Sequence, residues 1–522
     1  MKMPRLTGTR PAGDTLIQFK GYNNSDGAGK GEFTAMENMS SDRHPLLSPR
    51  KPRGTVMTLG KANGFLAREK MLWVDGDKLY YDGNEVCTVE DSEKTMISYG
   101  AYVIVFPDKI MYNTADGTVK QMEHKYTSTG TVSWKSAYLT DTSLSAEGQT
   151  YVEITASGIA EGFELNDGVE LSGFSNESLN GWHVIKEVGD GFIKIIGAID
   201  KAGSQTTAVT IERKLPECDC WTVAENRLWG CSSKNHEIYG SALGNPANFY
   251  NYEGLADSSY AATIAGDGEF TGAITYLGYV MFFKENGVHK LHGNKPGNYQ
   301  IMEGQLRGVA KGCSKSLQIV NEVLYYKSAS GIMSFQGSLP YEVGANIEGD
   351  YGVAEAGGVG NKYYISMEKD GKYHLFVYDA AKNLWHREDN THARWFSKSG
   401  EKLYYVEGDT VKTMVGDDDV LVDWSAETSD FTYQMADSKF ISRVSVRCEV
   451  ESRGSLEVWI DYDSKGDWKM LRNIGTKAKG IVNVPVIPAR CDHFKLKFSG
   501  YGKCAIHDMT IYLTTGSNER KW

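Results

Sequence analysis

Residues 385–392 carry the side chains that most often perform acid–base chemistry. The run 385–389 contains an imidazole, a guanidinium and two carboxylates, and His392 follows it closely. A glycoside hydrolase needs two carboxyl groups that face each other across the scissile bond. Glu388 and Asp389 are adjacent, and adjacent side chains of an extended strand point to opposite faces. We therefore expect these residues to make hydrogen bonds in a loop, and we predict that the protein is not an enzyme.

Cysteines and histidines that could bind a metal ion are spaced unsuitably. Cys218 and Cys220 form a CxC pair, whereas structural zinc sites use CxxC pairs. His289 and His292 lie three residues apart in a predicted strand, so their rings are expected on opposite faces. These residues are therefore expected to be ordinary strand residues.

Two loops match ligand-binding motifs only in part. Residues 27–31 are rich in glycine and contain a lysine, but they lack the GxxxxGK[ST] spacing of a phosphate-binding loop. Residues 416–419 include three aspartates whose oxygens could bind Ca²⁺. A calcium loop needs about six to eight oxygens at defined positions, and a solvated turn is the commoner structure for such a run. The sequence predicts no cofactor and no metal site.

Four basic residues lie close together near the N-terminus, namely Arg43, Arg50, Lys51 and Arg53. Residues 1–55 show little hydrophobic periodicity and contain several prolines, which is typical of an extended arm. Extended termini often reach neighbouring subunits, so these cations could pair with an acidic neighbour or with DNA phosphates. The alternative is that the arm docks on its own chain.

The composition limits the classes of protein that this chain can belong to. Among 522 residues there are 57 glycines, 12 prolines and 11% aromatic residues, which favours many short strands joined by tight turns. No segment approaches the roughly 20 apolar residues of a membrane span. The first residues lack the apolar run of a signal peptide, so we expect synthesis and assembly in a cytoplasm.

Charge and cysteine content add two further expectations. The eight cysteines are too sparse for a disulfide scaffold of this length, so free thiols are expected. The net charge of −11 argues against a general nucleic-acid-binding protein, which needs a basic face. It is compatible with a conduit for DNA, because an acidic wall repels phosphate.

An aromatic-rich strand, a polar turn and a second short strand recur along the chain. The first copy reads Met-Leu-Trp-Val, then Asp-Gly-Asp, then Lys-Leu-Tyr-Tyr. The copies lie at 71–81, 102–112, 227–239, 279–290, 323–335, 363–378 and 403–412. Self-similarity with a period of roughly 40–50 residues is typical of a β-propeller. The repeats therefore predict an all-β protein with about seven blades, in which tyrosines and tryptophans pack the blades.

The repeats are interrupted once, between Ile110 and Ile238. Alternating residues within this interval predict strands at 151–155, 168–173, 182–186 and 192–196, the last two joined by a Gly-Asp-Gly hairpin turn. We predict an inserted small β-barrel of four or five strands over residues 127–215. The propeller would then occupy residues 56–126 and 216–431.

The pattern changes again at about residue 432. Residues 444–450, 456–460 and 494–498 alternate between apolar and polar side chains, and clusters of turn residues separate them. This pattern favours an antiparallel β-sandwich or jelly roll over residues 432–522. Trp459 and Trp468 belong to this segment and are the residues we would test for contact with a glycan.

Several runs resemble a family of phage structural proteins. Residues 37–42 read Glu-Asn-Met-Ser-Ser-Asp and lead to Pro-Leu-Leu-Ser-Pro-Arg-Lys at 45–51, and further runs lie at 221–231, 238–249 and 282–293. The N-terminal run is similar to a motif of phage tail-hub or nozzle proteins, the propeller proteins also called packaged-DNA stabilisation proteins. The three later runs are similar to a blade strand common in virion structural proteins of phages from Gram-positive hosts. The resemblance covers about residues 1–126 and 216–430, and its motifs are structural rather than catalytic.

The resemblance implies a role in the virion tail. Such a protein would form a ring of identical subunits, commonly six, at the end of the portal and adaptor channel. It would retain the packaged genome and release it on infection. Its partners would be copies of itself, other tail or portal-adaptor proteins and the passing DNA. The resemblance leaves open the type of tail and the symmetry of the ring.

Two alternative functions belong to other classes. The C-terminal sandwich and the insert have architectures that are frequent in sugar recognition, which favours a carbohydrate-binding or receptor-binding tail protein. A propeller hydrolase or lyase that acts on surface polysaccharide is less well supported, because no suitable pair of carboxylates is evident.

Overall fold

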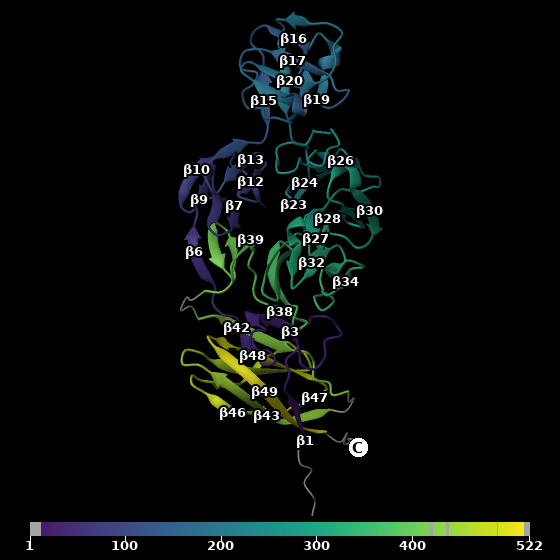
Figure 1. Cartoon of the computed structure of the whole chain (residues 1–522). Coiled ribbons are helices and arrows are strands. Elements are labelled where there is room, and N and C mark those ends of the chain that lie inside the picture. Colours follow the sequence, from purple (N-terminus) through teal and green to yellow (C-terminus); the bar gives the residue numbers. More distant parts are fainter. Residues whose placement is uncertain (1–11, 417–420, 435–437, 488, 516–522) are drawn as a thin grey trace, which may run out of the picture. The chain divides into compact units, whose positions relative to one another are not determined.

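The computed structural model describes residues 12–416, 421–434, 438–487 and 489–515 (Figure 1). Within these ranges the chain consists of β-strands and loops, with a few 3₁₀ helices of three residues. The all-β class expected from the aromatic, turn-rich composition is therefore confirmed. In the part of the chain that is described, no helix is long and apolar enough to span a membrane. The acidic run 417–419 lies outside the described residues.

The chain divides into two compact units, which we treat separately. The terminal unit comprises Met1–Met71 and Gln318–Trp522, and the central unit comprises Leu72–Leu317. Both contain small antiparallel sheets in which consecutive strands are neighbours. The expected repeats correspond to these sheets, because the aromatic strand and the short strand of each copy pair as a hairpin.

In the central unit, three sheets of four strands follow the chain in simple up-and-down order. Their strands are β11 (Thr95–Tyr99), β12 (Tyr102–Phe106), β13 (Ile110–Asn113) and β14 (Val119–Gln121); β23 (Cys220–Ala224), β24 (Arg227–Ser232), β25 (Glu237–Gly240) and β26 (Tyr260–Thr263); and β27 (Gly272–Tyr276), β28 (Tyr279–Lys284), β29 (Gly287–His292) and β30 (Gln300–Gln305). A further antiparallel meander consists of β8 (Met71–Asp75), β9 (Lys78–Tyr81) and β10 (Asn84–Thr88).

The terminal unit contains sheets of the same kind. Their strands are β31 (Gln318–Val320), β32 (Val323–Ser328), β33 (Gly331–Phe335) and β34 (Tyr341–Glu342); β35 (Ala354–Val359), β36 (Lys362–Lys369), β37 (Lys372–Asp379) and β38 (Leu384–Arg387); and β39 (Arg394–Ser399), β40 (Lys402–Glu407) and β41 (Thr410–Thr413). The last of these sheets takes its fourth strand from the other end of the chain, because β6 (Gly54–Thr58) pairs with β41. The next strand, β7 (Ala62–Ala67), contacts β39 of this sheet through a side chain, because the Ala67 amide donates to Ser397 Oγ at 2.8 Å.

Neighbouring sheets pack through aromatic side chains, as the repeats predict. In the central unit, the rings of Phe106 and Trp221 stack with centroids 4.7 Å apart, and both belong to one buried cluster with Phe249. In the terminal unit, Tyr364 and Tyr405 belong to a cluster shared by two successive sheets. Such rings bury a large apolar area and therefore stabilise these sheet-to-sheet contacts.

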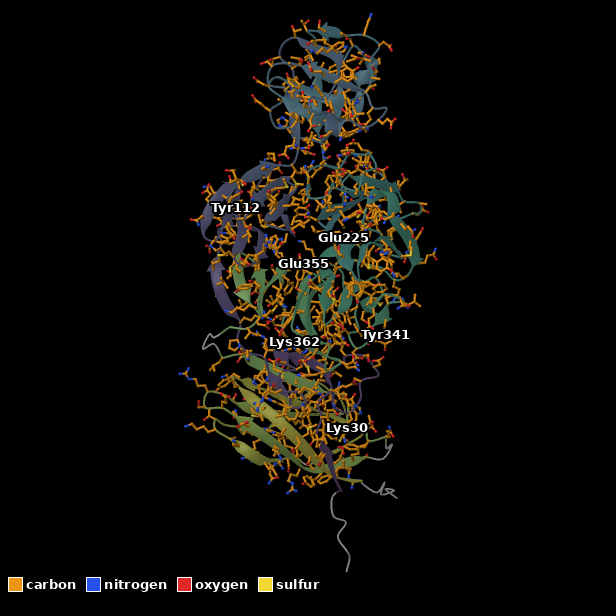
Figure 2. The ribbon with its side chains drawn as sticks, in the orientation of Figure 1. Lys30, Tyr112, Glu225, Tyr341, Glu355 and Lys362 are labelled. Atoms are coloured by element: carbon orange, nitrogen blue, oxygen red, sulfur yellow. The ribbon has the colours of Figure 1, made fainter. Side chains whose placement is uncertain are left out.

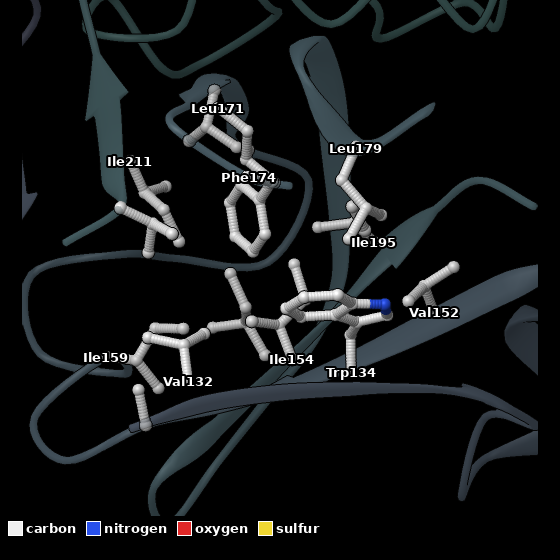
Figure 3. Packing of buried hydrophobic residues seen from close by; sticks show 14 of the residues in the cluster. Val132, Trp134, Val152, Ile154, Ile159, Leu171, Phe174, Leu179, Ile195 and Ile211 are labelled. Atoms are coloured by element: carbon white, nitrogen blue, oxygen red, sulfur yellow. The ribbon is translucent and has the colours of Figure 1, made fainter. Parts of the chain in front are cut away.

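The insert is an eight-stranded sheet with its own core. Its strands are β15 (His124–Thr127), β16 (Val132–Ala137), β17 (Tyr151–Thr155), β18 (Gly168–Ser172), β19 (Gly181–Gly189), β20 (Phe192–Ile196), β21 (Gly203–Gln205) and β22 (Thr210–Arg213). Figure 3 shows Trp134 and Phe174 among branched aliphatic side chains, and their ring centroids are 5.8 Å apart in an edge-to-face contact. The expected count of four or five strands is therefore wrong, because the short outer strands lack strong alternation.

Two further sheets contain the C-terminal strands. One has the order β1-β49-β43-β46 with β47 beside β43, and the other has the order β2-β3-β42-β48-β44-β45 (Figure 1). The strands are β1 (Ala12–Leu16), β2 (Gly21–Tyr22), β3 (Glu32–Glu37), β42 (Asp423–Thr428), β43 (Lys439–Val450), β44 (Leu456–Tyr462), β45 (Lys469–Ile474), β46 (Lys479–Pro485), β47 (Arg490–Cys491), β48 (Phe494–Tyr501) and β49 (Cys504–Thr515). The expected boundary at residue 432 is wrong, because β42 already belongs to the second sheet.

The N-terminal segment is not a separate arm over 1–55. Strand β1 pairs with β49, and β3 pairs with β42, so both complete sheets formed by the end of the chain. Phe33 is fully buried and Met36 is 3% exposed. Strand β3 therefore buries apolar side chains that an undocked arm would expose to water. The segment therefore docks on its own chain, which was the alternative to an arm that reaches a neighbour.

Candidate functional site: a polar clamp on the N-terminal segment

Two arginines of the N-terminal segment lie against two carboxylates that follow β38. Arg53 Nη2 is 2.7 Å from Glu388 Oε2 and 2.9 Å from Asp389 Oδ2. Arg50 Nη2 is 3.2 Å from Asp389 Oδ2. The arginine side chains are only 13% and 10% exposed, so two cations and two anions share a nearly dry site. A buried cluster of this kind is tolerated when the opposite charges balance and remain hydrogen-bonded.

The pKa shifts within this cluster follow from burial and from the neighbouring charges. Burial alone would lower the pKa of Arg53, but Glu388 and Asp389 reverse the effect and raise it. Burial and the adjacent Arg53 lower the pKa of Arg50. Burial alone would raise the pKa of Asp389, but Arg53 and bonds from Thr391 lower it below its usual range. The carboxylate of Asp389 is therefore held in its charged form.

This geometry bears on two expectations. Glu388 and Asp389 do not point to opposite faces, because β38 ends at Arg387 and both carboxylates turn toward the Arg53 guanidinium. Arg50 and Arg53 were expected as candidates for contact with a neighbour or with DNA. In this structure both guanidinium groups pair with carboxylates of their own chain and are largely buried.

The other two basic residues differ from this pair. Arg43 Nη2 is 3.6 Å from Glu449 Oε2, and both side chains are well exposed, at 49% and 35%. Lys51 is exposed. An exposed pair such as Arg43–Glu449 contributes about 0–1 kcal/mol, so Arg43 and Lys51 remain candidates for contact with a neighbour or with DNA.

A second group of polar contacts holds residues just upstream. Ser41 Oγ donates to Asp379 Oδ2 at 2.7 Å, and Lys382 Nζ donates to the Ser41 carbonyl at 2.6 Å. Lys362, labelled at the start of β36 in Figure 2, donates from Nζ to Asp42 Oδ1 at 2.6 Å. Burial alone would raise the pKa of Asp42, but Lys362 lowers it. We call both groups together, residues 38–53 with 362–391, the clamp.

Asn38 lies between the arginine group of the clamp and the sheet that contains β42. Its backbone adopts the left-handed region with φ 56°, which asparagine tolerates better than most residues. Its side chain donates from Nδ2 to the Asp423 carbonyl at 2.7 Å and accepts at Oδ1 from Arg50 Nε at 2.8 Å. The amide of Arg50 donates to the Asn38 carbonyl at 2.8 Å. Asn38 thereby links the arginines to the sheet that contains β42.

His386 lies inside the clamp on β38 and is 2% exposed. Among the described residues, neither ring nitrogen has a hydrogen-bond partner. Burial and the nearby Lys362 lower the pKa of His386 well below its usual range, although Asp42 opposes this effect. The ring is therefore neutral at physiological pH.

Sequence reasoning noted Arg50, Arg53, Glu388 and Asp389 separately but did not predict that they pair. The N-terminal run 37–42 was singled out by its resemblance, and it supplies Asn38, Ser41 and Asp42. Their partners Asp379, Lys362 and Lys382 carried no sequence signal, because each is an ordinary charged residue at a strand end or in a turn.

The two tryptophans proposed for glycan contact lie around one lysine of the C-terminal sheets. Trp459, on β44, is half-buried, and its Nε1 donates to Ser499 Oγ at 3.0 Å. It stands opposite Lys497 of β48 in the register. Lys497 Nζ lies 5.7 Å from the ring centroid of Trp468, which is also half-buried. The structure therefore brings both indoles to the same lysine and leaves both partly accessible.

The other residues considered for metal binding have conventional roles. His289 is buried beside Phe270, whereas His292 is exposed beside Tyr279, in agreement with opposite faces. Cys218 has a raised pKa because of burial. Within the described ranges, no group of three or more histidines, cysteines or carboxylates is arranged to hold a metal ion. The described cysteines are free thiols.

Comparison with known proteins gives matches among solved structures alone, and these are weak. No protein-family model and no curated protein sequence matches the chain. Among solved structures, apo AztD from Citrobacter koseri matches at 9% identity and a TM-score of 0.32, over 68% of this chain and 90% of that chain. An exo-beta-1,3-galactanase from Phanerochaete chrysosporium with galactose matches at 9% identity and 0.23, over 89% and 100%. An endosialidase of phage phi92 matches at 10% identity and 0.24, over 86% and 79%. Matches this weak carry no argument about activity.

Proposed function

We propose that this protein is a structural component of a bacteriophage virion, a tail hub, nozzle or stopper subunit that closes the DNA channel. In this role it retains the packaged genome and releases it on infection. The resemblance of residues 37–51 to phage tail-hub proteins motivates the proposal. The observation that carries it is the clamp, because the resembling residues are those that fasten the N-terminal segment inside the fold. A component under pressure from packaged DNA needs such internal fastening.

We also propose that the small sheets of the two units close into a seven-bladed β-propeller. The supporting observation is the pairing of β6 with β41, which joins a strand near the N-terminus to the last sheet of the series. Propellers are commonly closed by such a shared strand, which removes a free edge. On this proposal the insert is a small β-barrel, and the C-terminal sheets form a sandwich that includes β1 and β3.

The virion role is tested with particles that lack the protein. A nonsense mutation in its gene, grown in a non-suppressing host, should yield heads that lose DNA after packaging. Nuclease-protected DNA per particle, measured by quantitative PCR, should fall at least tenfold, and electron microscopy should show tails without their distal or connecting density. Full DNA retention with an unchanged tail would contradict the proposal.

The proposed assembly is a ring of identical subunits, with six as the expected number. Mass photometry of the purified chain over increasing concentration should reveal a closed oligomer, or a monomer that assembles only on connector particles. A monomer at all concentrations that also fails to bind purified connectors would contradict the ring. The substitution Lys51→Ala tests whether this exposed cation contributes to that contact.

A second function, recognition of a carbohydrate receptor, is favoured by the placement of Trp459 and Trp468 around Lys497. Partly accessible indoles beside a cation offer stacking and hydrogen-bonding groups to a sugar ring. Glycan-array binding by the wild-type protein, lost in both Trp459→Ala and Trp468→Ala, would support this function. Binding that survives both substitutions would exclude this surface as the receptor site.

A further inference from the structure

A pocket of about 390 Å³ lies in the terminal unit where the N-terminal segment meets β36, β37 and β38. Its aromatic wall contains Tyr22 and Phe376, with ring centroids 5.5 Å apart, and Tyr351, which is 5.6 Å from Phe376. Tyr22 and Phe376 are nearly buried, whereas Tyr351 is half-buried. The pocket therefore offers flat apolar surface to a small ligand, and its volume is typical of small-molecule sites.

The rest of the lining is basic, although the protein as a whole is acidic. Lys369, Lys372 and Arg387 face one carboxylate, that of Asp370. Within the described residues, none of these three cations forms an ion pair with a carboxylate. Arg387 donates from Nη1 to the Met36 carbonyl at 2.9 Å, which fixes the orientation of its planar guanidinium. A preoriented guanidinium beside unpaired lysines is suited to an anionic group.

His374 adds a neutral polar group to the same wall. Its Nδ1 lies 3.4 Å from Arg387 Nη2, and because arginine can only donate, Nδ1 is the acceptor in this contact. Burial, Arg387 and Lys369 lower the pKa of His374, so the imidazole is uncharged near neutral pH. The wall therefore combines fixed positive charge with a neutral ring that hydrogen-bonds polar groups.

A larger pocket in the central unit shows why this basic lining is significant. That pocket has a volume of about 650 Å³ and is also lined by lysines and aromatic rings. Its lysines are paired, however, with Lys234 2.7 Å from Glu217 and Lys315 2.6 Å from Glu93. Pairing neutralises the larger pocket, whereas the smaller pocket keeps an excess of positive charge.

We propose that the smaller pocket binds an acidic sugar residue. The carboxylate of the sugar lies between Arg387, Lys369 and Lys372, and one face of its ring packs on Tyr351. Only a ligand with both an anionic group and an apolar face uses both walls. A DNA duplex is held along an extended row of phosphate contacts, which a pocket of this size does not offer. The proposal is independent of the virion role, because every lining residue belongs to one unit.

Isothermal titration calorimetry with purified full-length protein tests the proposal. The probes are trigalacturonic acid and a neutral galactose trisaccharide of the same length. The acidic trisaccharide should bind with an affinity that falls as salt is raised, and the neutral one should not bind measurably. Lys372→Ala and Lys369→Ala should each weaken binding about tenfold, as expected for loss of one charge-assisted contact. Tyr351→Ala should weaken it by a similar factor.

The matched control is Lys402→Ala, which removes an exposed lysine from a hairpin of the next sheet. It should bind the acidic trisaccharide as the wild type does, and thermal unfolding should show that all variants are folded. Equal binding of the neutral probe, or no binding of the acidic one, would overturn the proposal. Tighter binding of inorganic phosphate or of a short DNA duplex in competition would also overturn it. An unaffected Tyr351→Ala would overturn the stacking of the sugar ring.

Discussion

Two buried aspartates, one in each unit, pair with arginine but have opposite pKa shifts. Asp389 in the clamp faces two guanidinium groups and accepts at Oδ1 from the Thr391 amide at 3.0 Å, and its pKa is lowered. Asp167 in the central unit faces only Arg213, with Nη1 2.6 Å from Oδ2. Burial outweighs this single pairing and raises the pKa of Asp167.

The difference shows how many partners a buried carboxylate needs. The Asp167 side chain is fully buried, and its Oδ1 has no hydrogen-bond partner in the described part of the chain. One cation and the Glu164 amide therefore do not compensate for its loss of water. Asp389 keeps 18% exposure and gains a second cation, so charge attraction exceeds the cost of burial. In the clamp the charged form of Asp389 is therefore favoured, whereas at Asp167 burial favours the protonated form.

The largest effect is expected from Arg53→Ala. This change leaves Glu388 and Asp389 buried with only Arg50 to neutralise them, and it should lower the free energy of unfolding by about 3–5 kcal/mol. Urea unfolding and hydrogen exchange of β38 would measure the loss. Lys51→Ala, two residues away and exposed, is the matched control and should change stability by less than about 0.5 kcal/mol. Equal effects of the two changes would show that the Arg53 ion pairs do not contribute to the free energy of unfolding.

Arg213→Ala should cost less, about 2 kcal/mol at pH 7, because Asp167 can take up a proton when its partner is removed. The sign follows from the raised pKa. In the folded state Asp167 binds a proton more readily than in the unfolded state, so the stability lost at pH 7 should partly return as the pH falls through the folded pKa. Unfolding at pH 7 and pH 5 checks this. A deficit that grows at low pH would contradict the comparison.

His386 should make the terminal unit sensitive to mild acid. Its folded pKa is well below the value near 6.5 of an unfolded histidine, so the unfolded state binds more protons as the pH falls below 6.5. The loss of unfolding free energy should approach about 1.4 kcal/mol per pH unit. His386→Phe should remove this slope, whereas His236→Gln, at an exposed histidine, should retain it. An unchanged slope in His386→Phe would assign the sensitivity to Asp42 or another group.

The smallest effect is expected from Arg43→Ala, which removes the exposed pair with Glu449. The change should alter the unfolding free energy by less than about 1 kcal/mol, and the effect should vanish at high salt. Urea unfolding at low and high ionic strength measures it. A loss as large as that of Arg53→Ala would mean that the exposure of a basic residue in this segment does not determine how much it contributes to stability.

The sequence predicted those features that depend on residues close together along the chain. Alternation and Gly-Asp turns located the hairpins, because hairpins are set by local periodicity. The strand Glu32–Glu37 was missed, although Phe33 and Met36 become buried, because its partner β42 lies at the other end of the chain. The pairing between the two sides of the clamp was missed for the same reason. Arg53 and Glu388 are 335 residues apart, and nothing in the local sequence of either specifies the other.

The pairing of β6 with β41 has a consequence for synthesis on the ribosome. Gly54–Thr58 emerges early, but the strand that completes its hydrogen bonds, Thr410–Thr413, is made about 350 residues later. The residues of the central unit, Leu72–Leu317, are continuous and can fold while translation proceeds. The terminal unit must wait with an unpaired strand until translation has passed Thr413. A chaperone that shields β6 during that interval would therefore raise the yield of folded protein.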